Sequence, residues 1–322
     1  MRSFLSAVAW SAALALPVCL GVVLWAQTPA AAPPVSPGSV DTSQPEAKFS
    51  SGVTQVNVLF TVTDKKGRFV TDLTVNDFEV IENKKPQFIQ QFTAESDLPL
   101  RMGLLIDTSN SIRDKFRFEQ QAAIRFMNDV IRPKNDRMLL MSFDSSAEVL
   151  SELTNNMELL EKGVNAMRPA GGTSLYDAIY MGAERLTREQ PREKFRRALI
   201  VITDGEDTQS HYTRDQALEM TQKADTVIYA ISTNTTRAGT EGDELLKYLA
   251  DQTGGEAFFP FHVEDLDQPF ENIANELRHQ YNIFYHPDPL KTDGLFHPIS
   301  VLVKTRKDLV VKARKGYYAP KF

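Results

Sequence analysis

The sequence predicts an α/β fold in which a doubly wound, mostly parallel sheet is flanked by a small β-sandwich. Between residues 98 and 280, continuous apolar runs of strand length alternate with stretches in which apolar residues recur at helical spacing. This pattern is typical of a parallel sheet with helices on both faces. Before and after that region, at 51–97 and 281–322, apolar and polar residues alternate, which indicates strands with one buried face.

Within the central region, each apolar run is a predicted strand and each periodic stretch is a predicted helix. The run 102–106 (Met-Gly-Leu-Leu-Ile), for example, contains no polar side chain and is followed by Asp107. A stretch of roughly 180 residues is long enough for a complete domain. The predicted strands are 102–106, 137–143, 198–203, 226–232 and 257–259, and the predicted helices are 116–131, 159–167, 174–186, 214–224, 244–253 and 266–279.

The two outer segments are predicted to pair into one small sandwich. Neither segment alone has enough strands to be stable. Because the two ends of an α/β domain can lie close together, the central domain can be inserted between the two halves of the sandwich. The expected strands are 54–63, 78–86 and 88–92 in the first segment, with a hairpin-like turn at the end of 78–86, and 281–285, 297–303 and 309–314 in the second.

Residues 1–26 are predicted to direct export. Arg2 precedes an apolar stretch that continues to Ala26, as in a secretory signal peptide. The stretch is also long enough to span a bilayer, so a cleaved signal peptide and an uncleaved N-terminal anchor both stay open. In either case we expect the rest of the chain outside the cytoplasm, as a periplasmic, envelope-associated or secreted protein. A Pro- and Ala-rich linker is predicted at 27–50.

The composition excludes several classes of protein. The chain has 322 residues and a formal net charge of −6, so it lacks the basic balance of a nucleic-acid-binding protein. Its single cysteine, Cys19, cannot form an intrachain disulfide. The five histidines show none of the spacings that are typical of zinc sites.

Three polar clusters follow predicted strands or open a predicted helix: Asp107-Thr-Ser109-Asn-Ser111, Gly171-Gly-Thr173-Ser and Asp204-Gly-Glu-Asp. Ligands of open α/β sheets bind at the carboxyl ends of the strands, so we expect the clusters to meet at one edge of the sheet. Their carboxylates and hydroxyls form a hard-oxygen donor set suited to Mg²⁺, with Mn²⁺ and Ca²⁺ as alternatives. Because only two of the donors are carboxylates, such an ion can accept one more anionic ligand from outside.

Each cluster alone has an ordinary explanation, because Asp and Ser are common helix caps and turn residues. Together, Asp107-x-Ser109-x-Ser111, Thr173 and Asp204-Gly resemble the metal-ion-dependent adhesion site of the von Willebrand factor type A (VWA) domain family. The resemblance covers residues 98–280. It implies that Ser109 and Ser111 bind the metal through their hydroxyls, and that the other three residues bind it directly or through water. It also implies that an Asp or Glu of a protein partner completes the coordination.

The flanking segments are similar to those of exported bacterial proteins related to this family. The resemblance implies a metal-dependent binding or adhesion protein of the cell envelope, and not an enzyme. A metal-dependent hydrolase is one alternative, but it would need a general base or nucleophile beside the metal, and the three clusters contain no histidine. A VWA subunit of an ATPase complex is the other alternative, against which the export signal argues. Contact with a membrane is expected only if 1–26 stays uncleaved.

Overall fold

The computed structural model describes residues 55–94, 98–114, 116–189, 195–234, 239–260 and 262–321. These residues belong to one compact unit, which spans Ser51–Phe322. The predictions of a signal peptide or anchor at 1–26 and of a linker at 27–50 lie outside the described residues. Within the described part of the chain, no helix is both long enough and apolar enough to cross a membrane.

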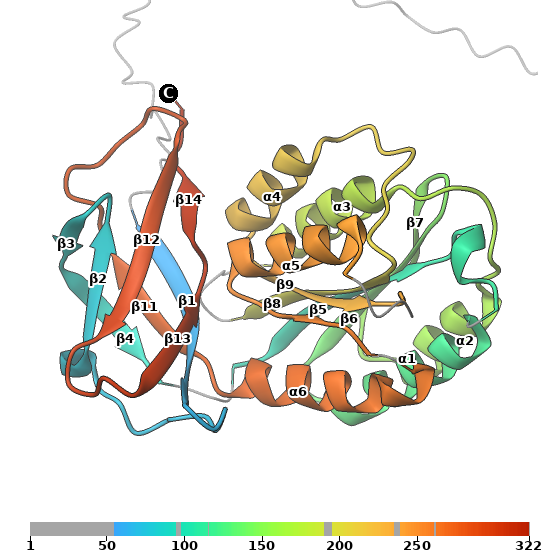
Figure 1. Ribbon diagram of the computed structural model, residues 1–322, viewed down its shortest axis with the longest axis horizontal. Helices are drawn as coiled ribbons and strands as arrows, with labels where there is room; N and C mark the ends of the chain where they lie inside the picture. The colour runs from blue at the N-terminus through green and yellow to red at the C-terminus, as the bar shows by residue number, and fades with distance from the viewer. Residues whose placement is uncertain are drawn as a thin grey trace, which may run out of the picture. The chain divides into compact units, whose positions relative to one another are not determined.

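The central region forms the predicted doubly wound sheet (Figure 1). Its strands lie in the order β10-β9-β8-β5-β6-β7. The central strand β5 pairs in parallel with β6 and β8, and β8, β9 and β10 continue in parallel. β7 runs antiparallel to β6 at one edge, so the sheet is mostly parallel, as predicted. The bounds are β5 (Leu100–Asp107), β6 (Arg137–Phe143), β7 (Ala147–Thr154), β8 (Arg196–Thr203), β9 (Thr226–Ser232) and β10 (Ala257–Phe258).

The helices cover both faces of this sheet. α1, α2 and α6 pack on one face, and α3, α4 and α5 pack on the other (Figure 1). Successive residues of β5 point to opposite faces, so Leu104 packs with the first group of helices and Leu105 with the second. All of β5 is buried, which explains its continuous apolar run. The bounds are α1 (Phe116–Val130), α2 (Met157–Ala166), α3 (Leu175–Thr187), α4 (Arg214–Lys223), α5 (Glu241–Thr253) and α6 (Asp267–Arg278).

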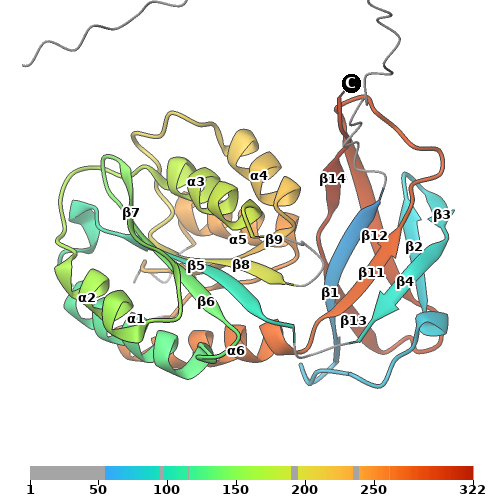
Figure 2. The same ribbon diagram turned by 180° about the vertical axis from the view of Figure 1, so that it is seen from behind.

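The outer segments form the predicted sandwich of two four-stranded sheets (Figure 2). In one sheet β1 pairs antiparallel with both β11 and β13, and in the other β2 pairs antiparallel with β12. Each sheet therefore combines strands from both outer segments of the sequence. The bounds are β1 (Val56–Asp64), β2 (Phe78–Glu82), β3 (Lys85–Gln87), β4 (Ile89–Thr93), β11 (Tyr281–Tyr285), β12 (Phe296–Val303), β13 (Leu309–Ala313) and β14 (Gly316–Tyr318).

The strands differ from the prediction at three places, because β3, β7 and β14 were not predicted as separate strands. Residues 78–86 were expected as one strand that ends in a hairpin-like turn; the turn is present at Asn83 and Lys84, and Lys85 and Pro86 beyond it belong to β3. Asn83 and Lys84 adopt φ values of 47° and 66° in the turn, as in a tight two-residue hairpin turn. β7 was not predicted, because most of its residues are only partly buried or exposed and an edge strand of this kind lacks a continuous apolar run.

Both connections between the sandwich and the central sheet lie at the edge where the parallel strands begin. β4 ends at Thr93 shortly before β5 starts at Leu100, and α6 ends at Arg278 shortly before β11 starts at Tyr281. β5 then runs away from the sandwich (Figure 1). The carboxyl ends of the parallel strands, where ligands of such sheets bind, therefore lie at the edge opposite the sandwich.

Candidate metal centre

The three polar clusters meet at this carboxyl edge. β5 ends at Asp107, and the neighbouring strand β8 ends at Thr203, directly before Asp204. The loop that carries Thr173 leads into α3, which packs on the same sheet. The topology thus brings together residues that are about one hundred positions apart in the sequence, as the clusters predict.

Asp107 is fully buried at the end of β5. Its Oδ1 accepts the N–H of Ser109 at 2.8 Å, and its Oδ2 accepts the hydroxyl of Thr203 at 2.6 Å. Burial raises the pKa of Asp107 to about 6, although these hydrogen bonds act in the opposite direction. No basic side chain among the described residues pairs with this carboxylate. A buried carboxylate without a cation is costly, so this position favours a metal ion.

A chain of hydrogen bonds joins three more of the predicted residues. The hydroxyl oxygens of Ser109 and Ser111 lie 2.8 Å apart, and the Ser111 hydroxyl donates to Oδ2 of Asp204 at 2.6 Å. Oδ1 of Asp204 accepts the N–H of Glu206 at 3.1 Å. Ser109 and Asp204 are buried while Ser111 is exposed, so the middle residue of this chain reaches the surface and both of its ends are buried.

Thr173 lies on a loop that is fastened to both of the other clusters. Its N–H donates to the hydroxyl of Thr208 at 2.9 Å, and its carbonyl accepts the N–H of Thr208 at 2.9 Å. On the other side, the N–H of Ala170 donates to the carbonyl of Thr108 at 2.7 Å. Among the described residues, no hydrogen bond joins the Thr173 side chain to the other four predicted ligands. Its hydroxyl is therefore not held in place by them.

The model of the von Willebrand factor type A domain family matches residues 102–276, which is more than half of the chain. The chain belongs to this family. The matched residues include all five predicted ligands and the strands that position them.

Similarity to individual proteins is weaker. A UPF0353 protein of Mycolicibacterium gilvum (strain PYR-GCK) is 24% identical over 207 residues, which cover 55% of this chain and 60% of that protein. The chain thus matches less than two thirds of that relative's length. A von Willebrand factor type A structure from Catenulispora acidiphila has 12% identity and a TM-score of 0.48, with 84% of this chain and 75% of that one covered. Proximal thread matrix protein 1 of the mussel byssus, solved with a zinc-occupied MIDAS motif, has 17% identity and a TM-score of 0.47, with 60% and 48% covered.

The turn after β8 places Asp204 within the VWA domain. Gly205 has φ = +84°, which favours glycine, and a Cβ there would lie 2.4 Å from the carbonyl oxygen of Gly242. Asn234, at the end of β9, donates to the carbonyl of Asp204 at 2.8 Å. The turn is therefore held from the side of α5 as well as from β5.

Thr203 and Asn234 support the predicted ligands, and the sequence analysis did not single them out. Each is one polar residue near the end of an apolar strand, which is common in any α/β protein. Ser174, the last residue of the second predicted cluster, lies directly before α3. It is fully buried, and its hydroxyl has no hydrogen-bond partner among the described residues. It follows Thr173 directly, so a second hydroxyl adjoins the ligand set.

His211 is the histidine closest in sequence to the third cluster, and its ring contacts the carboxylate of Asp177. Its Nδ1 lies 2.9 Å from Oδ2 of Asp177, whose Oδ1 accepts the N–H groups of His211 and Tyr212. Asp177 sits in the first turn of α3, so this contact fastens the loop after the third cluster to that helix. In the described part of the chain, the carboxylate that contacts His211 is that of Asp177, and not that of Asp107 or Asp204.

The donor set fits a hard divalent cation. No group of three or more His, Cys, Asp or Glu side chains that could hold a metal occurs in the described part of the chain. The predicted ligand set contains two carboxylates, those of Asp107 and Asp204, and three hydroxyls. Such oxygen ligands suit Mg²⁺, Mn²⁺ or Ca²⁺, and they do not suit the softer ions that select thiolate and imidazole.

Proposed function

We propose that this protein is an exported VWA module that binds a protein partner through a divalent cation. VWA domains are typically interaction modules without catalytic turnover, and they mediate protein–protein interactions. The observation that carries the proposal is the chain of contacts from Ser109 through Ser111 to Asp204, beside the buried carboxylate of Asp107. The proposed metal ligands are Asp107, Ser109, Ser111, Thr173 and Asp204.

Mg²⁺ is the proposed ion, with Mn²⁺ and Ca²⁺ as alternatives. When bound, the ion would supply a Lewis-acidic position for an outside anion. The chain's own residues supply the rest: Asp107 provides a buried negative charge, and Ser111 brings its hydroxyl to the exposed end of the site. Thr173 would bring a third hydroxyl from the opposite loop.

The proposed partner offers an Asp or Glu side chain to the metal. Arg113 lies two residues after Ser111 and is exposed. Its guanidinium donates to Oδ1 of Asn110 at 2.7 Å, which holds a positive charge beside the mouth of the site. A cation there favours the approach of an acidic partner.

Export is proposed from the apolar stretch at 1–26. If that stretch is cleaved, the module is periplasmic or secreted; if it is retained, the module is held at the membrane by its N-terminus. In both cases the metal-binding edge faces the envelope or the outside, where a partner in the envelope can reach it. Contact with nucleic acid is not expected from a chain with net charge −6.

Calorimetric titration with MgCl₂ tests the metal site. We expect the wild-type protein to bind one Mg²⁺ and Asp107→Ala to bind none. Asp215→Ala is the matched control, because Asp215 is an exposed residue of α4 whose carboxylate pairs with Arg214; we expect it to bind as the wild type does. Equal binding by Asp107→Ala and the wild type would refute the ligand assignment.

A pull-down from envelope extract tests the partner. The immobilised module is exposed to extract in MgCl₂ or in EDTA, and the retained proteins are identified. We expect a partner that is retained only in MgCl₂ and that is lost with Asp107→Ala. A partner retained equally in EDTA would place the binding surface elsewhere on the molecule.

A further inference from the structure

Helix α5 touches the turn that carries Asp204 at one end and the β-sandwich at the other. It begins at Glu241 and ends at Thr253, a length of about 20 Å at 1.5 Å per residue. It lies on the same face of the sheet as α3 and α4 (Figure 1).

The first contact is between backbones. A Cβ on Gly205 would lie 2.4 Å from the carbonyl oxygen of Gly242, and a Cβ on Gly242 would lie 2.2 Å from the carbonyl oxygen of Asp204. The first turn of α5 therefore packs directly against the Asp204–Gly205 peptide. Since no flexible side chain lies between them, a shift of the helix along its axis moves the turn as well.

A polar clamp holds the same end of α5. The side-chain amide of Asn234 donates to the carbonyl of Asp204 at 2.8 Å and to Oδ1 of Asp243 at 3.0 Å. Oδ1 of Asp243 also accepts the hydroxyl of Ser232 at 2.6 Å. Asp243 in the first turn of α5 and Asp204 at the metal site therefore share one amide group. The helix and the turn are coupled by hydrogen bonds as well as by contact.

The second contact, at the far end of α5, is also between backbones. Gly254 caps the helix with φ = +86°, and a Cβ there would lie 2.6 Å from the backbone nitrogen of Arg314 and 2.8 Å from the carbonyl carbon of Ala313. The N–H of Lys315 donates to the carbonyl of Gln252 at 3.2 Å. The end of α5 thus rests on the chain between β13 and β14 of the sandwich.

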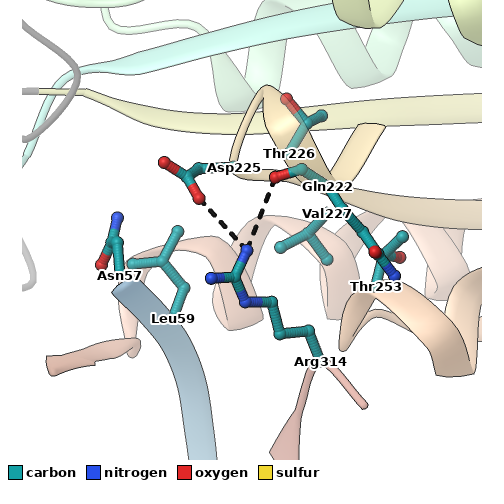
Figure 3. Close-up of a pocket in the computed structure, with 8 residues that line it drawn as sticks. All are labelled: Asn57, Leu59, Gln222, Asp225, Thr226, Val227, Thr253 and Arg314. Atoms are coloured by element: carbon teal, nitrogen blue, oxygen red, sulfur yellow. Dashed lines mark hydrogen bonds and ion pairs between the residues drawn. The ribbon is translucent and has the colours of Figure 1, made fainter. Parts of the chain in front are cut away.

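Beside this second contact, the side chain of Arg314 reaches across to the VWA domain (Figure 3). Its Nη1 donates to Oδ1 of Asp225 at 3.2 Å and to the carbonyl of Gln222 at 3.5 Å. A void of about 10 Å³ lies among these residues. The buried oxygens Oδ1 of Asn57 and Oε1 of Gln222 have no hydrogen-bond partner among the described residues. The side-chain contacts between the two parts are therefore incomplete, in contrast to the tight backbone contacts of α5.

We propose that α5 couples the position of the β-sandwich to the metal-binding turn, so that a change at the contact with 313–315 alters the order of the Asp204 turn and the affinity for the metal. The statement about metal affinity rests on the proposed function, whereas the statement about the turn does not. Coupling carried by packed elements of this kind changes an affinity by about fivefold.

The test places a methyl group at the far end of α5. Gly254→Ala adds a Cβ against the backbone of Arg314 at a positive φ. The matched control is Gly67→Ala, because Gly67 has φ = +76° in a sandwich turn and a Cβ there meets nothing within 4 Å. The two variants share the backbone strain of alanine at positive φ, and only the first one pushes on α5.

Two measurements are made on the folded protein. Hydrogen exchange in EDTA follows the N–H of Gly205, which donates to the Thr203 hydroxyl, and the N–H of Glu206, which donates to Asp204. Calorimetry then gives the Kd for Mg²⁺. We expect Gly254→Ala to speed exchange of both amides by about fivefold and to raise the Kd by a similar factor. We expect Gly67→Ala to leave both quantities within twofold of the wild type.

A second variant keeps the test independent of the strain at Gly254. Asp225 has φ = +49°, which Asn also adopts, so Asp225→Asn removes the charge opposite Arg314 without changing the backbone preference. We expect it to speed exchange of the same two amides in the same direction. If Gly254→Ala fails to fold, the exchange of these two amides in Asp225→Asn decides whether the coupling exists.

The outcomes separate the two proposals. Wild-type exchange at Gly205 and Glu206 in both variants would overturn the coupling. Equal effects of Gly254→Ala and Gly67→Ala would also overturn it, because general destabilisation would then explain the change. Faster exchange in a protein that binds no Mg²⁺ would leave the coupling standing and refute the proposed metal site.

Discussion

The hydroxyl of Thr203 donates a 2.6 Å hydrogen bond to Oδ2 of Asp107, and so joins the ends of two adjacent parallel strands at the proposed metal site. The same hydroxyl accepts the N–H of Gly205 at 3.1 Å. Thr203 therefore orients the carboxylate at the end of β5 and, at the same time, the turn that carries Asp204. Residues behind metal ligands commonly act in this way.

Replacing this hydroxyl is predicted to weaken metal binding without unfolding the protein. Thr203→Val keeps the shape of the side chain but removes the donor to Asp107 and the acceptor for Gly205. We expect the Kd for Mg²⁺ to rise about tenfold, as measured by calorimetry. Thr203→Ser retains the hydroxyl and should bind within about threefold of the wild type. Equal affinities of the valine variant and the wild type would show that Asp107 is oriented without Thr203.

The raised pKa of Asp107 predicts opposite pH dependences for stability and for metal binding. The carboxyl group titrates at about 6 in the folded protein, against an ordinary value of 3.8. The metal-free folded state therefore binds this proton more tightly than the unfolded state does. The contribution to stability is complete below pH 3.8 and is lost as the pH rises through 6, with a total size of about 3 kcal/mol. Metal binding requires the carboxylate, so affinity should fall about tenfold per pH unit below 6.

The measurement compares the wild type with Asp107→Asn, which does not titrate at this position. Urea unfolding in EDTA at pH 5 and pH 7 should show the wild type more stable at pH 5 by about 1 kcal/mol, relative to the same difference in the variant. Calorimetry at the two pH values should show weaker Mg²⁺ binding at pH 5. A wild type whose pH dependence matches that of Asp107→Asn would mean that Asp107 titrates near its ordinary value.

Much of the fold could be predicted because its strongest signals are local. β5 is buried on both faces and so reads as a continuous apolar run. β1 alternates because one of its faces packs in the sandwich core and the other carries mostly polar, partly buried residues. β7 escaped prediction because it is an edge strand whose apolar residues are only partly buried. The hairpin-like turn after β2 was predicted and lies at Asn83 and Lys84. β3 beyond it was not predicted, because its three residues are exposed or only partly buried and show no apolar alternation.

The five ligands could be proposed from the sequence because each follows a strand or opens a helix, and strand ends converge in an open sheet. Asn234 and Gly242, which contact the Asp204 turn, could not be predicted, because their contacts depend on which elements are neighbours in the folded chain. Asn234 contacts Asp204 only because β9 and β8 are neighbours in the sheet. Gly242 matters only because α5 starts beside the Asp204 turn. No spacing in the sequence indicates either contact, since both depend on the order of strands and the placement of a helix.

A buried polar cluster in the sandwich predicts a large loss of stability on truncation. Glu82 is buried on β2; its carboxylate accepts the hydroxyls of Tyr285 at 2.8 Å and Tyr317 at 3.2 Å, and it lies 3.1 Å from Nδ1 of His297. Burial and the neighbouring Glu82 raise the pKa of Tyr285, so its hydroxyl stays a donor at neutral pH. Because Glu82→Ala leaves the buried hydroxyls of Tyr285 and Tyr317 without this acceptor, we expect a loss of about 3 kcal/mol in the free energy of unfolding.

Urea unfolding of three variants checks this. Tyr285→Phe removes one donor and should cost about 1 kcal/mol. Glu79→Ala, on the more exposed side of the same strand, is the control and should change stability by less than about 0.5 kcal/mol. A Glu82→Ala protein as stable as the control would show that the cluster contributes no net stability to the sandwich.

The contact between Gly205 and Gly242 predicts that the turn at the metal site tolerates no side chain. Gly205→Ala places a Cβ 2.4 Å from a backbone oxygen at φ = +84°, where neither the helix nor the turn can yield without a shift. Strain at positive φ and overpacking each cost about 1–3 kcal/mol, so we expect a loss of about 3 kcal/mol in urea unfolding with EDTA present. Gly239→Ala is the control, because a Cβ there meets nothing within 4 Å, and it should lie within about 0.5 kcal/mol of the wild type. If Gly205→Ala is as stable as the wild type and also binds Mg²⁺ as the wild type does, the result would contradict the packing of α5 on this turn. The turn would then have room to move away from the helix.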